Sequence, residues 1–552
     1  MEANTDSLIV LAKDRFGLIT TAEQKMLLAI ERGQVADFSG VLSNSIDPLS
    51  RVTQRTISAE VLRWLLTEQS LLHVIKRQRI VVKFAVVHGE LDLSGSNIGY
   101  ILGLINCTIP NGINLQDTHI VTFNLQGTFC KHLIGDRIKT SGSIYLRFGF
   151  RTEGPIILAN SSIKGDLDCT GAHFSNPFLS SDNNVLKNKV HPQFFLAQPG
   201  TSLALDRSLI EGDVFLRFGF QSHGQVRLMG STINGSLDCR GGQFFSSVNP
   251  ALGAELAKIR GWARFDRDEH TKRVFETNGD VSLSGSTVGG FVSFRHAQFK
   301  KSSRNGAEIR NAVIGGPLIW KEVNINKTTR LRLSHTKIGQ LLDDETSWPR
   351  KNRLSLNGLT YDEIRGAPVH AKNRKKWLNS RFSWLHRQPR TEFSLQPYRQ
   401  LAESLRRTGY EENARAVLIK MYDERRKRGG LSKWGSVGSV ILKFTIGYGY
   451  KSHLAFLWGL GFVLVGAFIF YKADSNNLML HPNPNTVVRF NSIAYSLDTF
   501  LPVINLHQED WSPNSTQPVG LLVQIYLWLH TLMGWILTTL GVAGFTGLIR
   551  KE

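Results

Sequence analysis

The sequence predicts a mainly β protein, a right-handed parallel β-helix (solenoid), followed by two transmembrane helices. One observation is a long repeat: GSIYLRFGF (142–150) recurs as GDVFLRFGF (212–220), and GDLDCTGAHF (165–174) recurs as GSLDCRGGQF (235–244). A second is a shorter unit of 11 to 12 residues, in which Gly-x-apolar-x-apolar segments begin at Gly142, Gly154 and Gly165. Short alternating strands with glycine turns at positive φ, two units to a coil, describe a stacked solenoid. The third is a pair of long uncharged runs near the C-terminus.

Residues 1–80 are predicted to form a helical cap over the open end of the solenoid. TTAEQKMLLAIERG contains a capping box, with Thr20 and Glu23 three residues apart, and SAEVLRWLLTEQ, from Ser58, has one apolar face. The solenoid is predicted over 81–364, with insertions near 175–200 and 245–273, where the repeat is interrupted.

Acidic and thiol side chains recur on the predicted strands. Asp92, Asp168 and Asp238 follow an inward leucine in GELDL, GDLDC and GSLDC, so alternation turns them outward. Such a column would either hold a cation or form a solvated face, and we favour the solvated face. Cys169 and Cys239, on the same strands, are expected to be core thiols. With four cysteines and no CxxC pair, we expect neither a disulfide framework nor a metal site.

Residues 365–450 are predicted to form a basic helical hairpin and a juxtamembrane segment. Residues 365–451 hold 20 Lys and Arg against 6 Asp and Glu, a large share of the +21 of the whole chain. A basic linker, 365–390, precedes two amphipathic helices that turn at Gly409. A basic block beside an apolar span is typical of contact with anionic lipid headgroups, so nucleic acid is not expected as a partner. The residues predicted to face acidic lipid are Arg425, Arg426, Lys427 and Arg428.

Residues 451–552 are predicted to form the membrane domain, with spans at 454–471 and 520–549. Basic residues flank the outer ends of both spans, whereas the loop at 472–519 holds two Lys and Arg and four Asp and Glu. The positive-inside rule then places the solenoid and both termini in the cytoplasm. With no secretory signal at the N-terminus, we expect a multi-pass membrane protein with the bulk of its chain in the cytoplasm.

Two segments, one just before the first span and one between the spans, resemble parts of channels. TIGYG (445–449) spells a potassium-channel filter, but it precedes both spans, so a glycine-rich break after an interfacial helix is the favoured interpretation. The apolar segment 490–506 lies between the spans. It is either a re-entrant pore helix that would expose Asp498 to an ion path, or, as we favour, a helix on the outer surface.

The second predicted span carries polar side chains. Gln524 and His530 join Asp498 as candidate functional residues, because ionisable groups inside a membrane usually face a partner or a cavity. His530 is expected either to bond Asp498 or a neighbouring subunit, or to lie with Gln524 near the outer interface. Thr539, Ala543 and Gly547 form a small-residue ladder suited to helix packing, in a dimer or between the two spans.

The chain contains no phosphate-binding loop, zinc-protease, nucleophile-elbow or dinucleotide-binding pattern, so neither catalytic residues nor a cofactor is predicted. ISAEVLRWLLT (57–67), the GxLDCxGAxF repeats, SWPRKNRLSLNGLTYD (347–362), GYGY (447–450) and SLDTFLPVINL (496–506) together resemble a family of bacterial membrane proteins. The resemblance implies a cytoplasmic β-helical, pentapeptide-like repeat region before two C-terminal spans. Members often carry the label "membrane-associated oxidoreductase".

The predicted function is that of a membrane-anchored, non-catalytic scaffold whose solenoid binds a cytoplasmic protein. An oligomeric two-span pore with a loop helix is the second alternative, and it would require a homo-oligomer. A membrane-associated oxidoreductase is the third.

Overall fold

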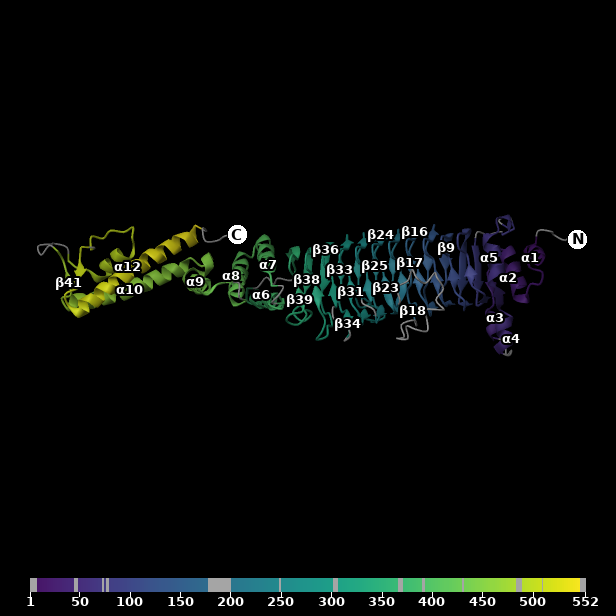
Figure 1. The fold of residues 1–552 in the computed structure, drawn as a ribbon, viewed down its shortest axis with the longest axis horizontal. Helices are drawn as coiled ribbons and strands as arrows, with labels where there is room; N and C mark the ends of the chain where they lie inside the picture. The colour runs from purple at the N-terminus through teal and green to yellow at the C-terminus, as the bar shows by residue number, and fades with distance from the viewer. Residues whose placement is uncertain are drawn as a thin grey trace. The chain divides into compact units, whose positions relative to one another are not determined.

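The computed structural model describes residues 7–43, 48–71, 74–75, 79–176, 200–247, 250–300, 306–365, 371–389, 393–428, 431–482, 489–508 and 510–546. The chain forms two compact units, Met1–Gln400 and Leu401–Glu552. The first contains the solenoid with its N-terminal helices, and the second contains the C-terminal helices (Figure 1).

Each turn of the solenoid carries short strands that stack on their counterparts in neighbouring turns. One turn consists of β15 (Ile156–Ile157), β16 (Ser162–Ile163), β17 (Leu167–Asp168) and β18 (His173–Ser175). Within the described solenoid the paired strands are parallel; β17 pairs with β21 (Val214–Phe215), which pairs with β25 (Leu237–Asp238). The stacks form sheets of 19, 10 and 11 strands, and the solenoid has about 11 turns. The predicted parallel solenoid is confirmed.

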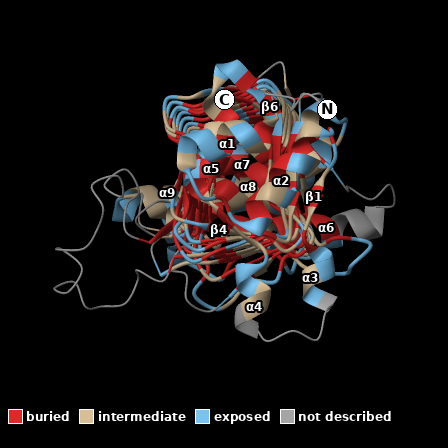
Figure 2. Ribbon diagram, turned by 90° about the vertical axis from the view of Figure 1, so that its right-hand side faces the viewer, coloured by how far each residue is buried: buried red, intermediate tan, exposed pale blue. Residues whose placement is uncertain are grey.

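The core of the solenoid is a continuous apolar column. Every second side chain points inward, so Leu167 and Leu237 are fully buried, as the alternation predicts. Seen along its axis, buried residues fill the inside of the coil and exposed residues lie at its turns (Figure 2). Aromatic rings from successive turns stack in this core with centroids 5.0 to 6.0 Å apart. They belong to Phe150, Phe174, Phe220, Phe244 and Phe275.

The repeat glycines stack backbone against backbone. The N–H of Gly235 donates to the carbonyl of Gly212 at 3.0 Å, and the N–H of Gly212 donates to that of Gly165 at 3.1 Å. A Cβ on Gly235 would lie 2.7 Å from the carbonyl carbon of Gly212, so the column has no room for a side chain. The predicted positive φ is wrong for these three glycines. Close approach of the turns requires them instead.

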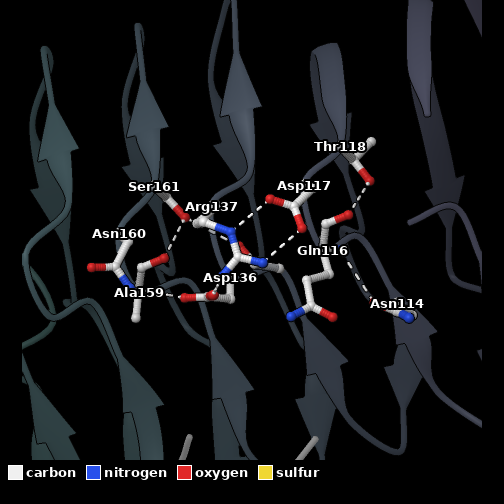
Figure 3. A network of polar contacts seen from close by, with 10 residues as sticks. Asn114, Gln116, Asp117, Thr118, Asp136, Arg137, Ala159, Asn160 and Ser161 are labelled. Atoms are coloured by element: carbon white, nitrogen blue, oxygen red, sulfur yellow. Dashed lines mark hydrogen bonds and ion pairs between the residues drawn. The ribbon is translucent and has the colours of Figure 1, made fainter. Parts of the chain in front are cut away.

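Positive φ falls at a different corner, where polar residues form a ladder between turns (Figure 3). Asp117, Arg137 and Asn160 have φ of 55°, 58° and 55°. The Arg137 guanidinium donates to both carboxylate oxygens of Asp117 at 2.6 and 2.7 Å and also to Asp136, which accepts from Asn160 at 3.0 Å. Because asparagine and aspartate tolerate this conformation well, the corner needs glycine in only some turns.

The N-terminal helices lie at the first turns of the solenoid, and the second and the last of them pack on its strands (Figure 2). They are α1 (Leu8–Phe16), α2 (Thr21–Glu31), α3 (Ser39–Ser43), α4 (Pro48–Thr53) and α5 (Ala59–Thr67). The predicted capping box of α2 is present, since Thr20 and Glu23 exchange side-chain-to-backbone hydrogen bonds of 3.1 and 2.7 Å. The boundary at residue 80 is wrong. β1 (Ala36–Asp37) and β2 (Thr56–Ser58) already pair with β3 (Arg79–Lys83) and β4 (Val86–His88).

The predicted insertion at 245–273 is largely a turn of the solenoid. β27 (Leu252–Gly253), β28 (Lys258–Ile259) and β29 (Ala263–Arg264) pair in register with neighbouring strands on both sides. Alanines replace larger residues here, at Ala251, Ala254, Ala257 and Ala263, and they hide the apolar pattern. The predicted insertion at 175–200 lies, for residues 177–199, outside the described residues.

The last turns of the solenoid hold α6 (Ala371–Leu385), a helix where the sequence predicted a basic linker. Arg381 of α6 forms a 2.7 Å ion pair with the buried Asp343 of β38 (Lys337–Asp343), and Trp348 stacks on Trp384 at 5.0 Å. Burial raises the pKa of Asp343 to about 6 despite the adjacent guanidinium. Asp344 accepts the backbone N–H groups of Thr346 and Ser347 in the turn before Trp348.

The second unit is helical. After α7 (Gln396–Arg407), in which the units meet, come α8 (Glu411–Lys427), α9 (Lys433–Ile446), α10 (His453–Ser475), α11 (Ser492–Phe500) and α12 (Pro518–Phe545). The predicted hairpin helices are present as α7 and α8, and Gly409 between them has φ of 81°. α10 and α12 are long and apolar enough to cross a membrane, and they run alongside one another (Figure 1).

Candidate functional site

The most distinctive feature of the second unit is that α11 lies between α10 and α12. At the start of α11, Tyr495 packs against Phe470 of α10, with ring centroids 4.8 Å apart, and in the same cluster as Val523 of α12. At its end, Phe500 packs with Val463 of α10 and Leu537 of α12. α11 therefore passes down the pair of long helices from one end toward the other. A position of this helix on the outer surface stays a prediction.

A buried polar cluster fixes the middle of α11. The Ser496 hydroxyl donates to the carbonyl of Val463 at 2.8 Å and lies 3.2 Å from Nε2 of His530. The same nitrogen lies 3.1 Å from the Ser496 carbonyl, and Nδ1 lies 3.4 Å from the Tyr526 hydroxyl. His530 is 1% exposed, so this cluster joins all three helices away from solvent.

Glycines on the long helices make room for α11. A Cβ on Gly534 of α12 would overlap the carbonyl group of Phe500, and one on Gly459 of α10 would lie 3.3 Å from the Phe500 ring. A Cβ on Gly466 would lie 2.7 Å from the His530 ring. The Gly466 Cβ would also overlap the Ser496 hydroxyl, so the glycines meet α11 at two levels, Ser496 and Phe500.

The chain after α11 turns back toward the level at which α11 begins. We call residues 501–508 the return segment. Asp498 accepts the N–H of Leu506 at 2.7 Å and that of Gln508 at 2.8 Å, and the Gln508 side chain accepts the N–H of Asn491 at 3.0 Å. Asp498 thus joins α11 to the non-helical chain beside it, and α11 with the return segment forms a helix–loop unit.

The other predicted polar residues of the membrane domain are placed differently. His530 contacts Ser496 and not Asp498, and it lies 12 residues after the first residue of α12; its position near the outer interface stays a prediction. Gln524 is half-buried, and within the described residues it makes no hydrogen bond.

The residues of the predicted packing ladder do not lie on the face of α12 that packs against the neighbouring helices of the same chain. Thr539 is exposed and donates to the Trp535 carbonyl of its own helix at 2.7 Å, Ala543 is half-buried, and Gly547 lies outside the described residues. The small residues that contact the neighbouring helices are Gly534, Gly541 and Gly544. Thr539 therefore does not pack against the other span of the same chain. Its role in a dimer contact stays a prediction.

TIGYG forms the break between α9 and α10. Gly447 and Gly449 have positive φ, and the Tyr448 hydroxyl bonds Asp423 at 3.2 Å. α9 carries an apolar stripe that the chain leaves exposed, formed by Trp434, Val437, Ile441 and Phe444. The glycine-rich break after an amphipathic helix is confirmed, and the filter interpretation does not fit this fold.

The basic cluster at the end of α8 is mostly ion-paired. Arg426 lies 3.7 Å from Asp423, while Lys427 and Arg428 lie 3.8 and 3.3 Å from Glu424. Asp423 also accepts Lys443 of α9 at 2.8 Å. These four pairs join α8 to itself and to α9, so Arg425, which is exposed, is the member best placed to meet an anionic headgroup.

On the solenoid, the predicted aspartate column is wrong. Asp92 belongs to a different sheet from Asp168 and Asp238, and Phe215 stands between these two in the ladder. Both are buried, because Arg147 pairs with Asp168 at 2.9 Å and Arg217 pairs with Asp238 at 2.8 Å.

These arginines belong to an arginine–aromatic strip along one corner of the solenoid. Guanidinium groups lie over half-exposed rings, 4.0 Å from the Phe215 centroid for Arg217 and 4.4 Å from that of Tyr145 for Arg147. The strip continues over further turns through Phe148, Phe218, Arg240, Trp262, Arg264 and Phe291. The sequence signal for it was the repeated LRFGF, in which each arginine is followed by an aromatic residue.

Other solenoid features follow the sequence. All four cysteines are free and buried, and burial raises the pKa of Cys107 and of Cys130 to about 12. In the part of the chain that the structure describes, no group of three or more His, Cys, Asp or Glu could hold a metal ion. No family model, curated protein or solved structure matches the chain.

Proposed function

We propose that the second unit is a membrane pore module, in which several copies of the chain assemble so that their re-entrant loops surround a shared aqueous path. The single observation that carries this proposal is the packing of α11 against two helices of membrane-spanning length, with the return segment exposed beside it. From the sequence alone, a pore is the alternative to a scaffold. The packing of α11 against both long helices favours the pore.

The depth of the loop supports re-entry into the hydrocarbon core. In the apolar run Leu454–Tyr471, Gly459 lies 12 residues, about 18 Å, from Tyr471. The ring of Phe500 packs at Gly459. A bilayer core is about 30 Å thick, so a span placed on this run carries Phe500 past the midplane.

The return segment cannot face lipid at that depth. It is non-helical, and residues 502–507 are exposed in the single chain. Peptide groups of irregular backbone find no hydrogen-bond partners in hydrocarbon, so such backbone occurs within membranes only where protein covers it or water reaches it. Asp498, at the level of Leu506, adds a carboxylate with the same requirement.

Two spans from one chain cannot enclose a channel, so the proposal requires a homo-oligomer with cyclic symmetry. Val503 is 88% exposed, and Ile504 and Leu506 are also exposed. Around a shared axis these side chains would form an apolar constriction, which closes a pore by excluding water.

Ion flux from liposomes containing the full chain tests this function. Val503→Asn should raise the flux, because a polar ring wets the constriction, and Gly534→Leu should abolish it by displacing α11. Gly461→Ala is the matched control, since a Cβ there meets no atom within 4 Å. A monomer in detergent, or inserted protein that shows no flux even as Val503→Asn, would contradict the proposal.

A second candidate is the scaffold function, which the arginine–aromatic strip favours. Arginine and aromatic residues are enriched in protein–protein interfaces, and Phe148 is 56% exposed at the strip. Solenoids offer long lateral surfaces to a partner. Under this candidate a cytoplasmic protein cross-linked to the intact chain should be lost in Phe148→Ala and kept in Val313→Ala, an exposed residue outside the strip. Equal cross-linking in both variants would show that the arginine–aromatic strip does not bind the cytoplasmic protein.

For location, we propose a bacterial inner membrane with the solenoid and both termini in the cytoplasm, on the basis of the flanking charges. The family likeness of the quoted motifs supports the same arrangement. A reporter that is active only in the periplasm, fused after Glu552, should be inactive. The oxidoreductase label belongs to the family that the motifs resemble. It forms no part of the proposed function, which rests on the membrane unit.

A further inference from the structure

An apolar groove runs along the second unit beneath the end of α11. Its volume is about 740 Å³, and its walls are the first half of α10 and the last part of α12. Ala455, Phe456 and Leu460 line one side, and Leu537, Gly541 and Val542 line the other. Leu497, Phe500 and Leu501 close its inner end. Ser452 and His453 line its other end, at which we place the entrance.

The groove has the length of one leaflet. It extends along α10 from Ser452 to Val463, which is 11 residues or about 17 Å of helix. Half of a bilayer core is about 15 Å thick. A chain entering from one side of the membrane would therefore pass Phe500 and reach the inner end of the groove, at Val463, near the midplane.

The entrance of the groove lies at the level expected for lipid headgroups. The exposed apolar stripe of α9 is typical of a helix in the membrane interface, and the chain passes from α9 through the break at Gly447–Gly449 to Ser452. His453, which lines the groove, and Lys451, two residues before it, are both exposed. A cationic side chain next to an apolar groove complements an anionic headgroup attached to an acyl chain.

We infer that this groove binds one acyl chain of an anionic phospholipid from the leaflet on the side of α9, with its headgroup beside Lys451. The bound chain packs under Phe500 and so supports the inner end of the re-entrant loop. This inference rests on the proposed membrane placement of α10 and α12 and not on conduction.

Photo-cross-linking in liposomes tests the site. The full chain is reconstituted with a phospholipid that carries a diazirine in one acyl chain, on either an anionic or a zwitterionic headgroup, and the adducts are mapped by mass spectrometry. Adducts should concentrate on Leu460 and Val542. The anionic probe should label these residues several-fold more than the zwitterionic probe, and Lys451→Gln should remove that preference.

A filled groove supplies the control. Gly541→Phe should reduce the groove adducts at least five-fold, because a Cβ at Gly541 points into space bounded by Ala455 at 3.7 Å. Leu529→Phe, on an exposed face of α12 outside the groove, should leave them unchanged. If Gly541→Phe does not fold, Val542→Trp fills the same space.

Two outcomes would overturn the inference. One is equal labelling of the groove and of the other exposed faces of α10 and α12. This result would mean that the groove holds lipid no better than the rest of the helix surface. The other is a cross-link between two copies through Leu460→Cys, which would mean that a second copy fills it. Both results are independent of ion flux, so they are distinguishable from failure of the pore.

Discussion

The hydroxyl of Ser496 lies 3.2 Å from Nε2 of His530, 34 residues further along the chain, and it donates to the Val463 carbonyl at 2.8 Å. One serine thus joins α11 to both long helices. The contact is buried, where a polar group has few other partners, so it selects one seating of the loop.

His530→Ala should loosen α11 without unfolding the unit. Hydrogen bonds between membrane helices contribute about 0.6 kcal/mol on average and at most about 1.7 kcal/mol. We expect a lower Tm in detergent and faster hydrogen exchange over α11. Gln524→Ala, one to two turns away on the same helix, should change neither. Equal effects of both substitutions would contradict the assignment of His530 as the residue that positions α11.

Gly534→Ala should be more damaging than most glycine substitutions in helices. Alanine ordinarily stabilises a helix by up to about 1 kcal/mol relative to glycine. Here its Cβ would overlap the Phe500 carbonyl group, and the backbone of α11 would have to move. Gly461→Ala, with open space around it, should instead raise the Tm slightly. A Tm for Gly534→Ala at or above wild type would show that α11 is not seated there.

Asp238→Asn should destabilise the solenoid strongly. Removing one partner of a buried ion pair costs roughly 3–5 kcal/mol, and this change leaves both Arg217 and Arg240 without their carboxylate. Asp117→Asn, in an exposed pair with Arg137, should cost about 0–1 kcal/mol. Denaturant unfolding of the full chain, with hydrogen exchange over β21 and β25, measures the contrast. Similar losses for the two variants would contradict it.

The same pair predicts a pH dependence. Burial raises the pKa of Asp238, but hydrogen bonds from Arg240 and Arg217 outweigh it, so the pKa lies below its usual value. A carboxyl with a lowered folded-state pKa contributes stability above its ordinary pKa of about 4, and that contribution is lost as the pH falls through the folded-state value. Wild type should therefore lose its advantage over Asp238→Asn below about pH 4. An advantage that persists at lower pH would contradict the prediction.

Gly235→Ala tests the glycine column. The added Cβ would meet the Gly212 backbone at 2.7 Å, and overpacking of this kind costs roughly 1–3 kcal/mol. Gly99→Ala, where nothing lies within 4 Å, is the control within the same solenoid. Hydrogen exchange should rise around β25 in the first variant only. Unchanged exchange there would mean that the turns can separate enough to admit a side chain.

The sequence predicted the solenoid well because its cause is local. Alternating residues, an 11-residue unit and recurring glycines each leave a direct pattern. The sequence did not show the role of Gly212 and Gly235, because close approach depends on which turns become neighbours. It also missed the turn containing Ala257 and Ala263, since small core residues weaken the apolar pattern on which the prediction relied.

The site was harder to predict, because its parts are distant in sequence. Asp498 and His530 were found as polar residues near apolar spans, but their partners were not. Ser496 and Gly534 carry no sequence signal of their own, and the small-residue ladder was placed instead at Thr539, Ala543 and Gly547. Only the tertiary packing of α11 separates these alternatives.

Thiol labelling of two cysteine variants tests the central claim, that the return segment meets water at membrane depth. Leu506 and Leu464 lie at similar levels of the unit, because Leu506 bonds Asp498 and Leu464 follows Val463, which bonds Ser496. The four native thiols are buried and should contribute little labelling. In liposomes, a charged, membrane-impermeant reagent should modify Leu506→Cys and leave Leu464→Cys unmodified. Protection of both residues, or equal labelling of both, would contradict the account.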